Sequence, residues 1–328
     1  MSERKLASVQ RVAEIKPIDG ADAIEAVRVN GWWVVSKKGE FNVGDLVVYF
    51  EIDSWIPTEL APFLSRGKDP REYNGVKGER LRTIKLRGQL SQGLVLPADA
   101  AGSFHTEGDD VTEFLGVQKW EKPIPVQMQG QMRGNFPSFI PKTDQERVQN
   151  LPKVFDGTAA EYEVTIKLDG SSMTVYWWEG VFGVCSRNID LKTEQQGNTF
   201  VDTAKRVFDG RTFDGLAIQG ELMGPGVQGN RENLKQHEFF VFDIFDIEEQ
   251  RYYAPVERQR FCATHCLNHV PIETHCMTLD GSTLDSLLAF AEGRSLNSQV
   301  REGLVFKRMD GKFSFKVISN KFLLGEKE

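Results

Sequence analysis

Apolar and polar residues alternate along the first third of the chain, in short runs separated by turn residues. Alternation with a period of two is the pattern of a strand with one buried face. The runs cover residues 7–15, 24–29, 32–35, 46–52, 80–87 and 93–97. Asn30-Gly31, a dipeptide typical of hairpin turns, separates the second run from the third. Short strands with glycine-rich corners predict a small closed barrel of the OB type over residues 1 to about 115.

From residue 160 onward the pattern is mixed. Strands are predicted at 161–167, 173–178, 181–186, 216–222, 239–246, 303–308 and 312–318, and helices near 199–209, 255–268 and 283–292. This alternation favours an α+β domain with a substantial antiparallel sheet. Residues 116–145 contain prolines and glutamines that interrupt any regular pattern, so we expect a linker there and a second domain over 146–328. A short helix is predicted near residue 143, with Thr143 as N-cap and Glu146 as its capping-box partner.

The composition is that of an ordinary globular protein. The 328 residues are 40% hydrophobic and 27% charged, and no apolar run approaches the length of a membrane span. The N-terminus has no apolar signal core, and four cysteines without a framework spacing suggest reduced thiols, so a cytoplasmic setting is expected. A net charge of −7 does not announce a nucleic-acid-binding protein, although it leaves room for a local basic groove.

One basic stretch on the predicted barrel is a candidate RNA-binding surface. If residues 80–87 form one strand, Arg80 and Arg82 share one face, and Lys85 and Arg87 share the other. The stretch is either a solvated amphipathic strand or a groove that follows phosphates. Nearby aromatic residues could stack on bases, but aromatics on barrel strands are more often core. They are Trp32, Trp33, Tyr49, Phe50 and Trp55.

The most informative stretch of the second domain is Lys167-Leu168-Asp169-Gly170. It follows an apolar strand and precedes another, so taken alone it predicts a hairpin with a surface lysine. The alternative is a lysine held at the end of a strand, partly desolvated, whose lowered pKa makes it a nucleophile at neutral pH.

Other charged residues lie within predicted strands of the same domain or next to their ends. They are Arg187, Glu221, Asp243, Glu302 and Lys316. Each alone could simply face water. On strands of one sheet, they are the set of cations and carboxylates that binds a triphosphate and a divalent metal.

In this order these motifs resemble those of covalent nucleotidyltransferases, the superfamily of ATP-dependent DNA ligases, RNA ligases and mRNA capping enzymes. The motifs are Lys167-Leu-Asp-Gly170, Ser186-Arg187-Asn188, Glu221, Phe239-Phe-Val-Phe242-Asp243, Glu302-Gly-Leu-Val-Phe-Lys307 and Phe315-Lys316-Val317. The similarity is greatest to RNA ligases with an N-terminal OB domain, also through residues 142–150 and 220–229.

The resemblance implies ATP-dependent joining of RNA ends. Lys167 would attack the α-phosphorus of ATP and form a lysyl-AMP. The AMP would pass to a 5′-phosphate end, and a 3′-hydroxyl would then displace it. Glu302 would bind Mg²⁺ or Mn²⁺, with Asp169 and Asp243 as further candidate ligands. Lys316 would pair with the α-phosphate.

The remaining roles concern the nucleotide. Arg187 and Glu221 would hold the ribose, and Arg147 could grip the β- and γ-phosphates. Phe242 would stack on adenine, with Phe240 as the alternative because period two places both on one face. Lys307, which closes the Glu302 motif, completes the nucleotide-binding set, as does Asp169.

The chain departs from the superfamily pattern in two respects. Many relatives carry two lysines in the last motif, but here the second position is Ile318, and Lys312 and Lys321 are the candidate substitutes. The chain also ends soon after Lys316, with no room for a C-terminal OB domain, which favours an RNA ligase over the alternatives. Those alternatives are a DNA ligase, an mRNA guanylyltransferase, and a non-catalytic OB-fold nucleic-acid-binding protein.

Two further motifs are given little weight. Residues 224–229 match G-x-G-x-x-G, but Pro225 and the polar residues around it indicate a loop, and no P-loop motif occurs. The cysteines and histidines of residues 262–276 match no common zinc spacing, and Cys262, Cys266 and His269 are better explained as one face of a helix, with zinc as the alternative.

Overall fold

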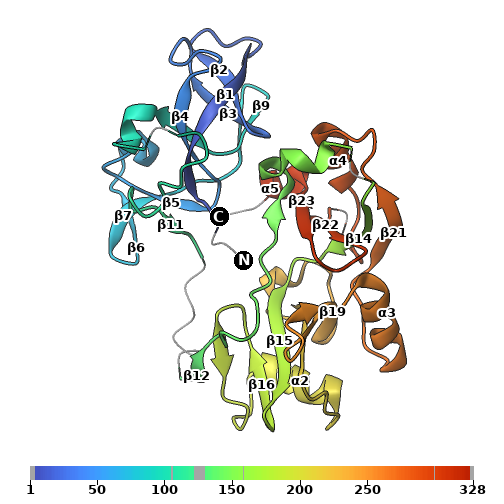
Figure 1. The fold of residues 1–328 in the computed structure, drawn as a ribbon. Helices are drawn as coiled ribbons and strands as arrows, with labels where there is room; N and C mark the ends of the chain where they lie inside the picture. The colour runs from blue at the N-terminus through green and yellow to red at the C-terminus, as the bar shows by residue number, and fades with distance from the viewer. Residues whose placement is uncertain (1–3, 105, 122–129, 158, 299, 326–328) are drawn as a thin grey trace. The chain divides into compact units, whose positions relative to one another are not determined.

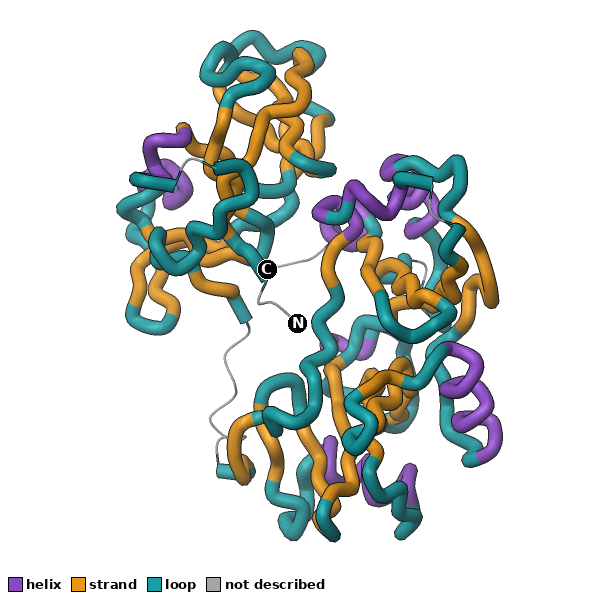
Figure 2. Tube along the Cα trace, viewed as in Figure 1, coloured by secondary structure: helices purple, strands orange, loops and turns teal. Residues whose placement is uncertain are grey.

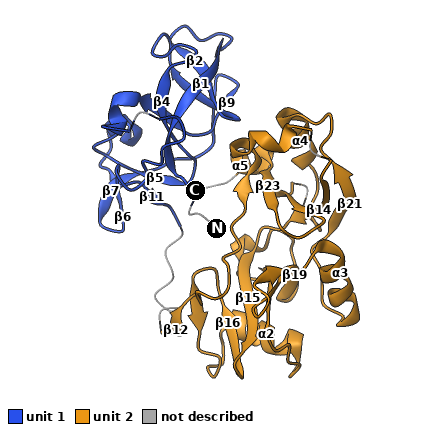
Figure 3. Ribbon diagram, viewed as in Figure 1, with its two compact units in different colours: residues 1–123 blue, residues 124–328 orange. Residues whose placement is uncertain are grey.

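The structure, a computed structural model, describes residues 4–104, 106–121, 130–157, 159–298 and 300–325. The chain forms two compact units, Met1–Pro123 and Ile124–Glu328 (Figure 3). Their boundary lies inside the linker expected at residues 116–145. The two ends of that stretch are structured, because β11 (Gln118–Lys119) pairs with the first unit and β12 (Met132–Asn135) with the second. Among the described residues, strands outnumber helices in both units. Figure 2 shows the strands in orange.

The first unit is a β-barrel built from short strands (Figure 1). Besides β11, its strands are β1 (Ala7–Pro17), β2 (Ile24–Val29), β3 (Trp32–Lys37), β4 (Leu46–Phe50), β5 (Ser54–Pro57), β6 (Arg71–Tyr73), β7 (Val76–Arg80), β8 (Ile84–Leu86), β9 (Gln89–Ser91) and β10 (Leu94–Pro97). Strand β1 runs between β2 and β4, in the sheet order β10-β4-β1-β2-β3. Trp32, Tyr49, Phe50 and Trp55 are buried in its core, as expected for barrel aromatics.

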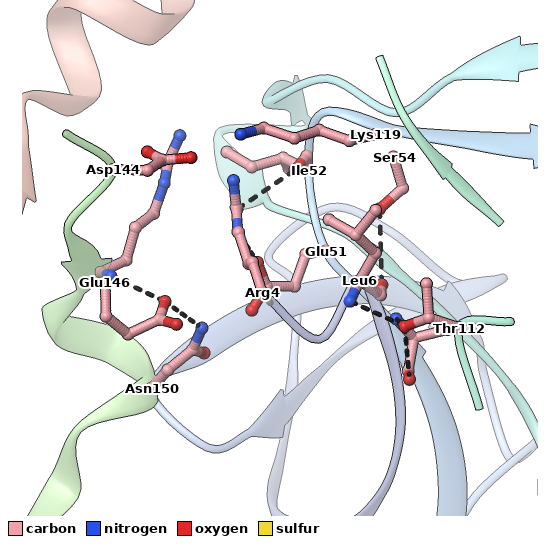
Figure 4. Close-up of polar contacts among 12 residues, drawn as sticks. Arg4, Leu6, Glu51, Ile52, Ser54, Thr112, Lys119, Asp144, Glu146 and Asn150 are labelled. Atoms are coloured by element: carbon pink, nitrogen blue, oxygen red, sulfur yellow. Dashed lines mark hydrogen bonds and ion pairs between the residues drawn. The ribbon is translucent and has the colours of Figure 1, made fainter. Parts of the chain in front are cut away.

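The start of the barrel is fixed by a side chain from its far end. The Thr112 hydroxyl accepts hydrogen bonds from the amides of Leu6 and Ala7, each at 3.0 Å (Figure 4). Leu6 and Ala7 then continue into the core with Val111 and Leu115. The N-terminal strand is therefore held at its first residues, where a chain end would otherwise fray.

The basic stretch is not one strand, so the predicted sharing of faces is wrong. Arg80 ends β7, and Lys85 lies in β8. Between them Leu81 turns into the core and exchanges backbone hydrogen bonds with residues 53 and 54. Arg87, at φ 47°, starts the turn of the β8–β9 hairpin. The buried Leu81 breaks the alternation that the sequence pattern suggested.

The second unit contains two antiparallel-rich sheets covered by helices (Figure 1). Besides β12, its strands are β13 (Glu146–Arg147), β14 (Glu161–Lys167), β15 (Ser171–Trp178), β16 (Val181–Cys185), β17 (Ile189–Leu191), β18 (Leu216–Met223), β19 (Glu238–Asp246), β20 (Arg251–Tyr252), β21 (Ile272–Thr278), β22 (Gly303–Arg308) and β23 (Ser314–Ile318). The helices are α2 (Thr199–Phe208), α3 (Pro255–Thr264), α4 (Leu284–Ala291) and α5 (Asn320–Gly325).

Each sheet has its own hydrophobic core. The seven-stranded sheet, in the order β12-β17-β16-β15-β18-β19-β20, packs against α2 and α3 through Val201, Phe208 and Cys262. The five-stranded sheet, in the order β13-β23-β22-β14-β21, packs against α4 through Leu287 and Ala291. The α+β class with a preceding OB barrel is therefore confirmed.

Two local predictions in this unit are wrong. The helix expected near Thr143 does not form, since Glu146 and Arg147 make the short strand β13, which pairs with β23 in parallel. The Asp169-Gly170 turn is not a hairpin, because β14 pairs with β21 and β22, whereas β15 pairs with β16 and β18. Residues 168–170 instead carry the chain from the five-stranded sheet to the seven-stranded sheet.

Candidate active site

Lys167 lies at the point where the chain passes between the two sheets. It is the last residue of β14 and pairs with Gly303 of β22, which places Glu302 beside it. Lys167 Nζ lies 2.8 Å from Glu302 Oε2, and the two side chains are 25% and 18% exposed. The β14–β22 register therefore delivers a lysine and its carboxylate partner to the same strand ends.

Gly170 allows the second sheet to approach this lysine. A Cβ at this position would clash with the Leu222 carbonyl oxygen and the Met223 sulfur of β18. Without a side chain, the Gly170 amide donates a hydrogen bond of 2.9 Å to Glu221 Oε1. Glycine is thus required here for close backbone approach rather than for a turn conformation.

The charges around Lys167 reverse one expectation from the sequence. Burial lowers the pKa of the Lys167 amine, but the nearby carboxylates of Glu302, Glu221 and Asp169 outweigh it, and the net pKa is raised. The prediction of a lowered pKa is therefore wrong for this arrangement of the protein alone. Burial also raises the pKa of Glu221, to about 8, against the opposing charge of Lys167.

A second cluster joins residues predicted to bind the nucleotide. Lys316 Nζ donates to Asp144 Oδ1 at 2.9 Å, and Arg187 Nη2 donates to Asp144 Oδ2 at 3.2 Å. Lys316 pairs along β23 with Arg147 of β13, whose side chain is buried. Asp144 was not predicted, because an acidic residue in a linker carries no signal of what it will contact. The segment that carries it also touches β15, since the Thr143 and Ser172 hydroxyls are 3.0 Å apart.

The residue before Arg147 holds this short strand in place. Glu146 Oε1 accepts a hydrogen bond from the Arg147 backbone amide at 2.8 Å and another from Asn150 Nδ2 at 2.9 Å (Figure 4). The carboxylate thus closes the turn that follows β13, in place of the predicted helix cap.

Phe240 and Phe242 share one hydrophobic cluster with Leu168, next to the lysine. A bulge in β19 accommodates Phe242, because Val241 pairs with Gly220 and Asp243 pairs with Gln219. Phe240 is buried, whereas Phe242 keeps part of its surface exposed. Of the two candidates for stacking on adenine, Phe242 is therefore the accessible one.

Asp243 and Lys307 belong to a buried ion network instead of facing the site. Lys307 donates to the Asp243 carboxylate and to the Phe242 carbonyl. Arg258 of α3, fully buried, is paired with Glu163 of β14 and lies 3.9 Å from Asp243. In this arrangement Asp243 is paired with cations and Lys307 donates to the Phe242 carbonyl, so the metal-binding role of Asp243 and the nucleotide-binding role of Lys307 stay predictions.

The second lysine position of the last motif holds an apolar residue. Ile318 is buried and pairs with Gly303, so no cation occupies the second lysine position of the last motif. Lys312 is exposed in the β22–β23 turn, and Lys321 is exposed on α5. Asp169 lies 3.7 Å from Arg231, a residue that the sequence reasoning missed.

The cysteine and histidine cluster does not share a helix face, because α3 ends at Thr264, before Cys266 and His269. His269 pairs with Arg258 instead. Among the described residues, no group of three or more metal-ligating side chains is placed to hold a metal. All four cysteines are free thiols.

On the barrel, Arg80 is engaged within its own unit. Its guanidinium pairs with Asp53 at 2.5 Å and stacks 4.0 Å from the centre of the Trp120 ring. Trp33 is the one aromatic of the five predicted residues that keeps exposed surface. It lies against Lys16, whose amine is 3.9 Å from the ring centre.

Comparisons with known proteins agree with this geometry. A family model described as an OB-fold domain matches residues 6–98, and one described as RNA ligase matches residues 160–318. Among solved structures, a Naegleria gruberi RNA ligase mutant with AMP and Mn is 48% identical, covers 98% of both chains and has a TM-score of 0.88. The same ligase with PPi is 48% identical, with the same coverage and a TM-score of 0.87. A search of curated proteins found no match.

An OB barrel followed by two sheets that meet at a strand-end lysine is the architecture of a polynucleotide ligase. The chain belongs to the RNA ligase family. The expectation of an ATP-dependent RNA ligase is confirmed over the DNA ligase, guanylyltransferase and non-catalytic alternatives. In the described part of the chain no helix is both long and apolar enough to cross a membrane.

Proposed function

We propose that this RNA ligase joins 3′-hydroxyl and 5′-phosphate ends of nicked or broken RNA through a lysyl-AMP at Lys167. The observation that carries the assignment is the position of Lys167 at the end of β14, 2.8 Å from Glu302 and beside Glu221 and Asp169. A lysine in this setting is held in one orientation and has a carboxylate within reach of its proton.

In the first step, the Lys167 amine attacks the α-phosphorus of ATP. A P–N bond forms, the bond to the β-phosphate oxygen breaks, and pyrophosphate leaves. Lys316 faces the α-phosphate, Arg147 binds the departing phosphates, and Arg187 and Glu221 bind the ribose. Phe242 stacks on adenine, since it is the exposed ring of its cluster. Lys316 is already held by a carboxylate, which marks where an anion binds.

ATP and a divalent cation, Mg²⁺ or Mn²⁺, are the cofactors of the reaction. The residues fit such an ion, because Glu302 and Asp169 offer carboxylate oxygens, the hard ligands that these ions prefer, and both keep some exposure. When bound, the ion neutralises phosphate charge and lowers the pKa of the Lys167 amine by repulsion. In the protein alone, Glu302 and Asp169 raise the pKa of Lys167. A cation bound to these carboxylates would cancel that effect and so favour the unprotonated, nucleophilic amine.

We assign the RNA-binding role to the OB barrel, with its Arg82, Lys85 and Arg87 as candidate phosphate contacts and Arg80 held by Asp53. Deletion of residues 1–123 is expected to impair sealing more than formation of the lysyl-AMP. Equal loss of both steps would show that the barrel is needed for the folding of the second unit instead. The free thiols are compatible with a cytoplasmic setting, which we also propose.

The substrate assignment is tested with nicked duplexes that carry either RNA or DNA on the 3′-hydroxyl side. We expect ATP-dependent sealing of the RNA substrate and little sealing of an all-DNA nick. Efficient sealing of all-DNA nicks would overturn the RNA preference. Single-stranded and nicked RNA substrates, compared in the same assay, separate the joining of broken strands from the joining of nicks.

A further inference from the structure

The connection between β18 and β19, residues 224–237, places an unassigned arginine beside Asp169 of the Lys167 motif. Arg231 lies 3.7 Å from Asp169, two residues after Lys167, and its guanidinium packs 4.6 Å from the centre of the Phe322 ring on α5. The arginine therefore lies between Asp169 of the first motif and α5, which follows the last motif.

The connection that carries Arg231 is held firmly. Glu232, the next residue, is buried and accepts hydrogen bonds from the Asn297 amide at 2.5 Å and the Ser298 amide at 2.9 Å. Leu234 packs on the cluster that contains Phe240 and Phe242. An arginine on a flexible loop would lose entropy when it bound a ligand, whereas this one is already positioned.

Most hydrogen-bond donors of the Arg231 guanidinium have no acceptor among the described residues. It carries five N–H donors, yet within the described ranges of the chain it makes no hydrogen bond, and its loose ion pair with Asp169 occupies one edge. One face of the plane is covered by Phe322, and the side chain is 34% exposed. A planar guanidinium with open donors, fixed beside a phosphoryl-transfer centre, is suited to a terminal phosphate group.

We propose that Arg231 binds the 5′-terminal phosphate of the RNA strand during AMP transfer, an inference that rests on the proposed ligase function. In that step an oxygen of the RNA 5′-phosphate attacks the phosphorus of the lysyl-AMP. The new P–O bond completes a 5′–5′ pyrophosphate, the P–N bond breaks, and the amine of Lys167 takes up a proton. Arg231 supplies positive charge and N–H donors to the incoming phosphate.

The test compares R231M with R231K. Methionine keeps an apolar contact with Phe322 but removes the charge, whereas lysine keeps the charge without the planar donors. The control is R251M, because Arg251 also packs on an aromatic ring, that of Tyr253 at 5.5 Å, in the same unit. Three quantities are measured for each variant: adenylylation by ATP, AMP transfer from adenylylated enzyme to 5′-phosphorylated RNA, and the melting temperature.

For R231M we expect a KM for the phosphorylated RNA that is higher by about tenfold to a hundredfold in AMP transfer, the range for loss of a charge-assisted hydrogen bond. The KM for ATP, the adenylylation rate and the melting temperature should stay near those of wild type. R231K should lie between the two, and R251M should match wild type in every assay.

Two outcomes would overturn the inference. Unchanged AMP transfer in R231M would show that Arg231 does not bind the RNA end. An equal loss of adenylylation and transfer, or a higher KM for ATP, would assign Arg231 to ATP or to structure. Failure of the wild-type protein to form any lysyl-AMP would instead reject the proposed function, so the two failures are distinguishable.

Discussion

Asp144 forms ion pairs with two cations that are assigned to the nucleotide, so removing its negative charge should strengthen ATP binding. Its two carboxylate oxygens accept from Lys316 at 2.9 Å and from Arg187 at 3.2 Å. These are the residues assigned to the α-phosphate and the ribose. ATP must therefore displace the carboxylate from one or both cations. We expect D144N, which keeps the shape but removes the charge, to bind ATP more tightly.

The magnitude follows from the exposure of these ion pairs. The side chains of Lys316, Asp144 and Arg187 are 11%, 33% and 52% exposed, so both pairs are partly screened by water. Pairs of this kind contribute about 0.2–1 kcal/mol each. Two of them together amount to about 1 kcal/mol, or roughly a fivefold lower Kd for ATP.

The assay is calorimetric titration of wild type and D144N with an ATP analogue that has a methylene bridge between its α- and β-phosphorus atoms, so that no lysyl-AMP forms. D310N serves as the matched control, because Asp310 forms an ion pair with Arg308 at 2.8 Å in the β22–β23 turn. That variant should bind the analogue as wild type does. Weaker or unchanged binding by D144N would refute the competition and make Asp144 a residue that positions the two cations.

Two further predictions concern stability. Replacing Arg258 with methionine leaves the buried Glu163 carboxylate without its cation. The free energy of unfolding of the second unit, measured by urea denaturation, should therefore fall by about 3–5 kcal/mol. A loss under about 1 kcal/mol would contradict a structural role for this ion network. Because burial raises the pKa of Glu221 to about 8, the protonated form stabilises the fold and this contribution falls as the pH rises from about 4.5 through 8. The melting temperature of E221Q, relative to wild type, should therefore be higher at pH 8.5 than at pH 5, and the opposite order would reject the assignment.

Much of the site was accessible from the sequence because its chemistry is local to strand ends. Lys167 ends the expected strand β14, Glu302 directly precedes β22, and Lys316 lies within β23. Lys167 and Glu302 pair at 2.8 Å. The order of these motifs along the chain also indicates which residues, far apart in the sequence, belong to one site. The fold class followed from the same runs, since period-two alternation is set by burial of one face.

What the sequence did not reveal depends on contacts between distant segments. The Asp169-Gly170 dipeptide is read as a hairpin, but whether its flanking strands pair with each other is decided by β18 and β22, which lie over 40 residues away. Asp144 and Arg231 come from a linker and a loop, where no periodicity marks a functional residue. The pairing of Asp243 with the buried Lys307 and Arg258 is likewise visible only in three dimensions.

The basic stretch on the barrel shows the same limit. Alternation at residues 80–87 predicted one continuous strand, whereas the backbone hydrogen bonds of Leu81 with residues 53 and 54 divide it into two elements. One buried residue in an otherwise regular pattern was sufficient to change which cations share a surface.

The central claim is that Lys167 carries AMP, and its most direct test is to map the covalent adduct. The protein is incubated with ATP labelled at the α-phosphate and a divalent cation, and the labelled peptide is then identified by mass spectrometry. We expect an acid-labile AMP on Lys167 in the wild-type protein and none in K167A. Labelling that persists in K167A, or that maps to another residue, would contradict the mechanism.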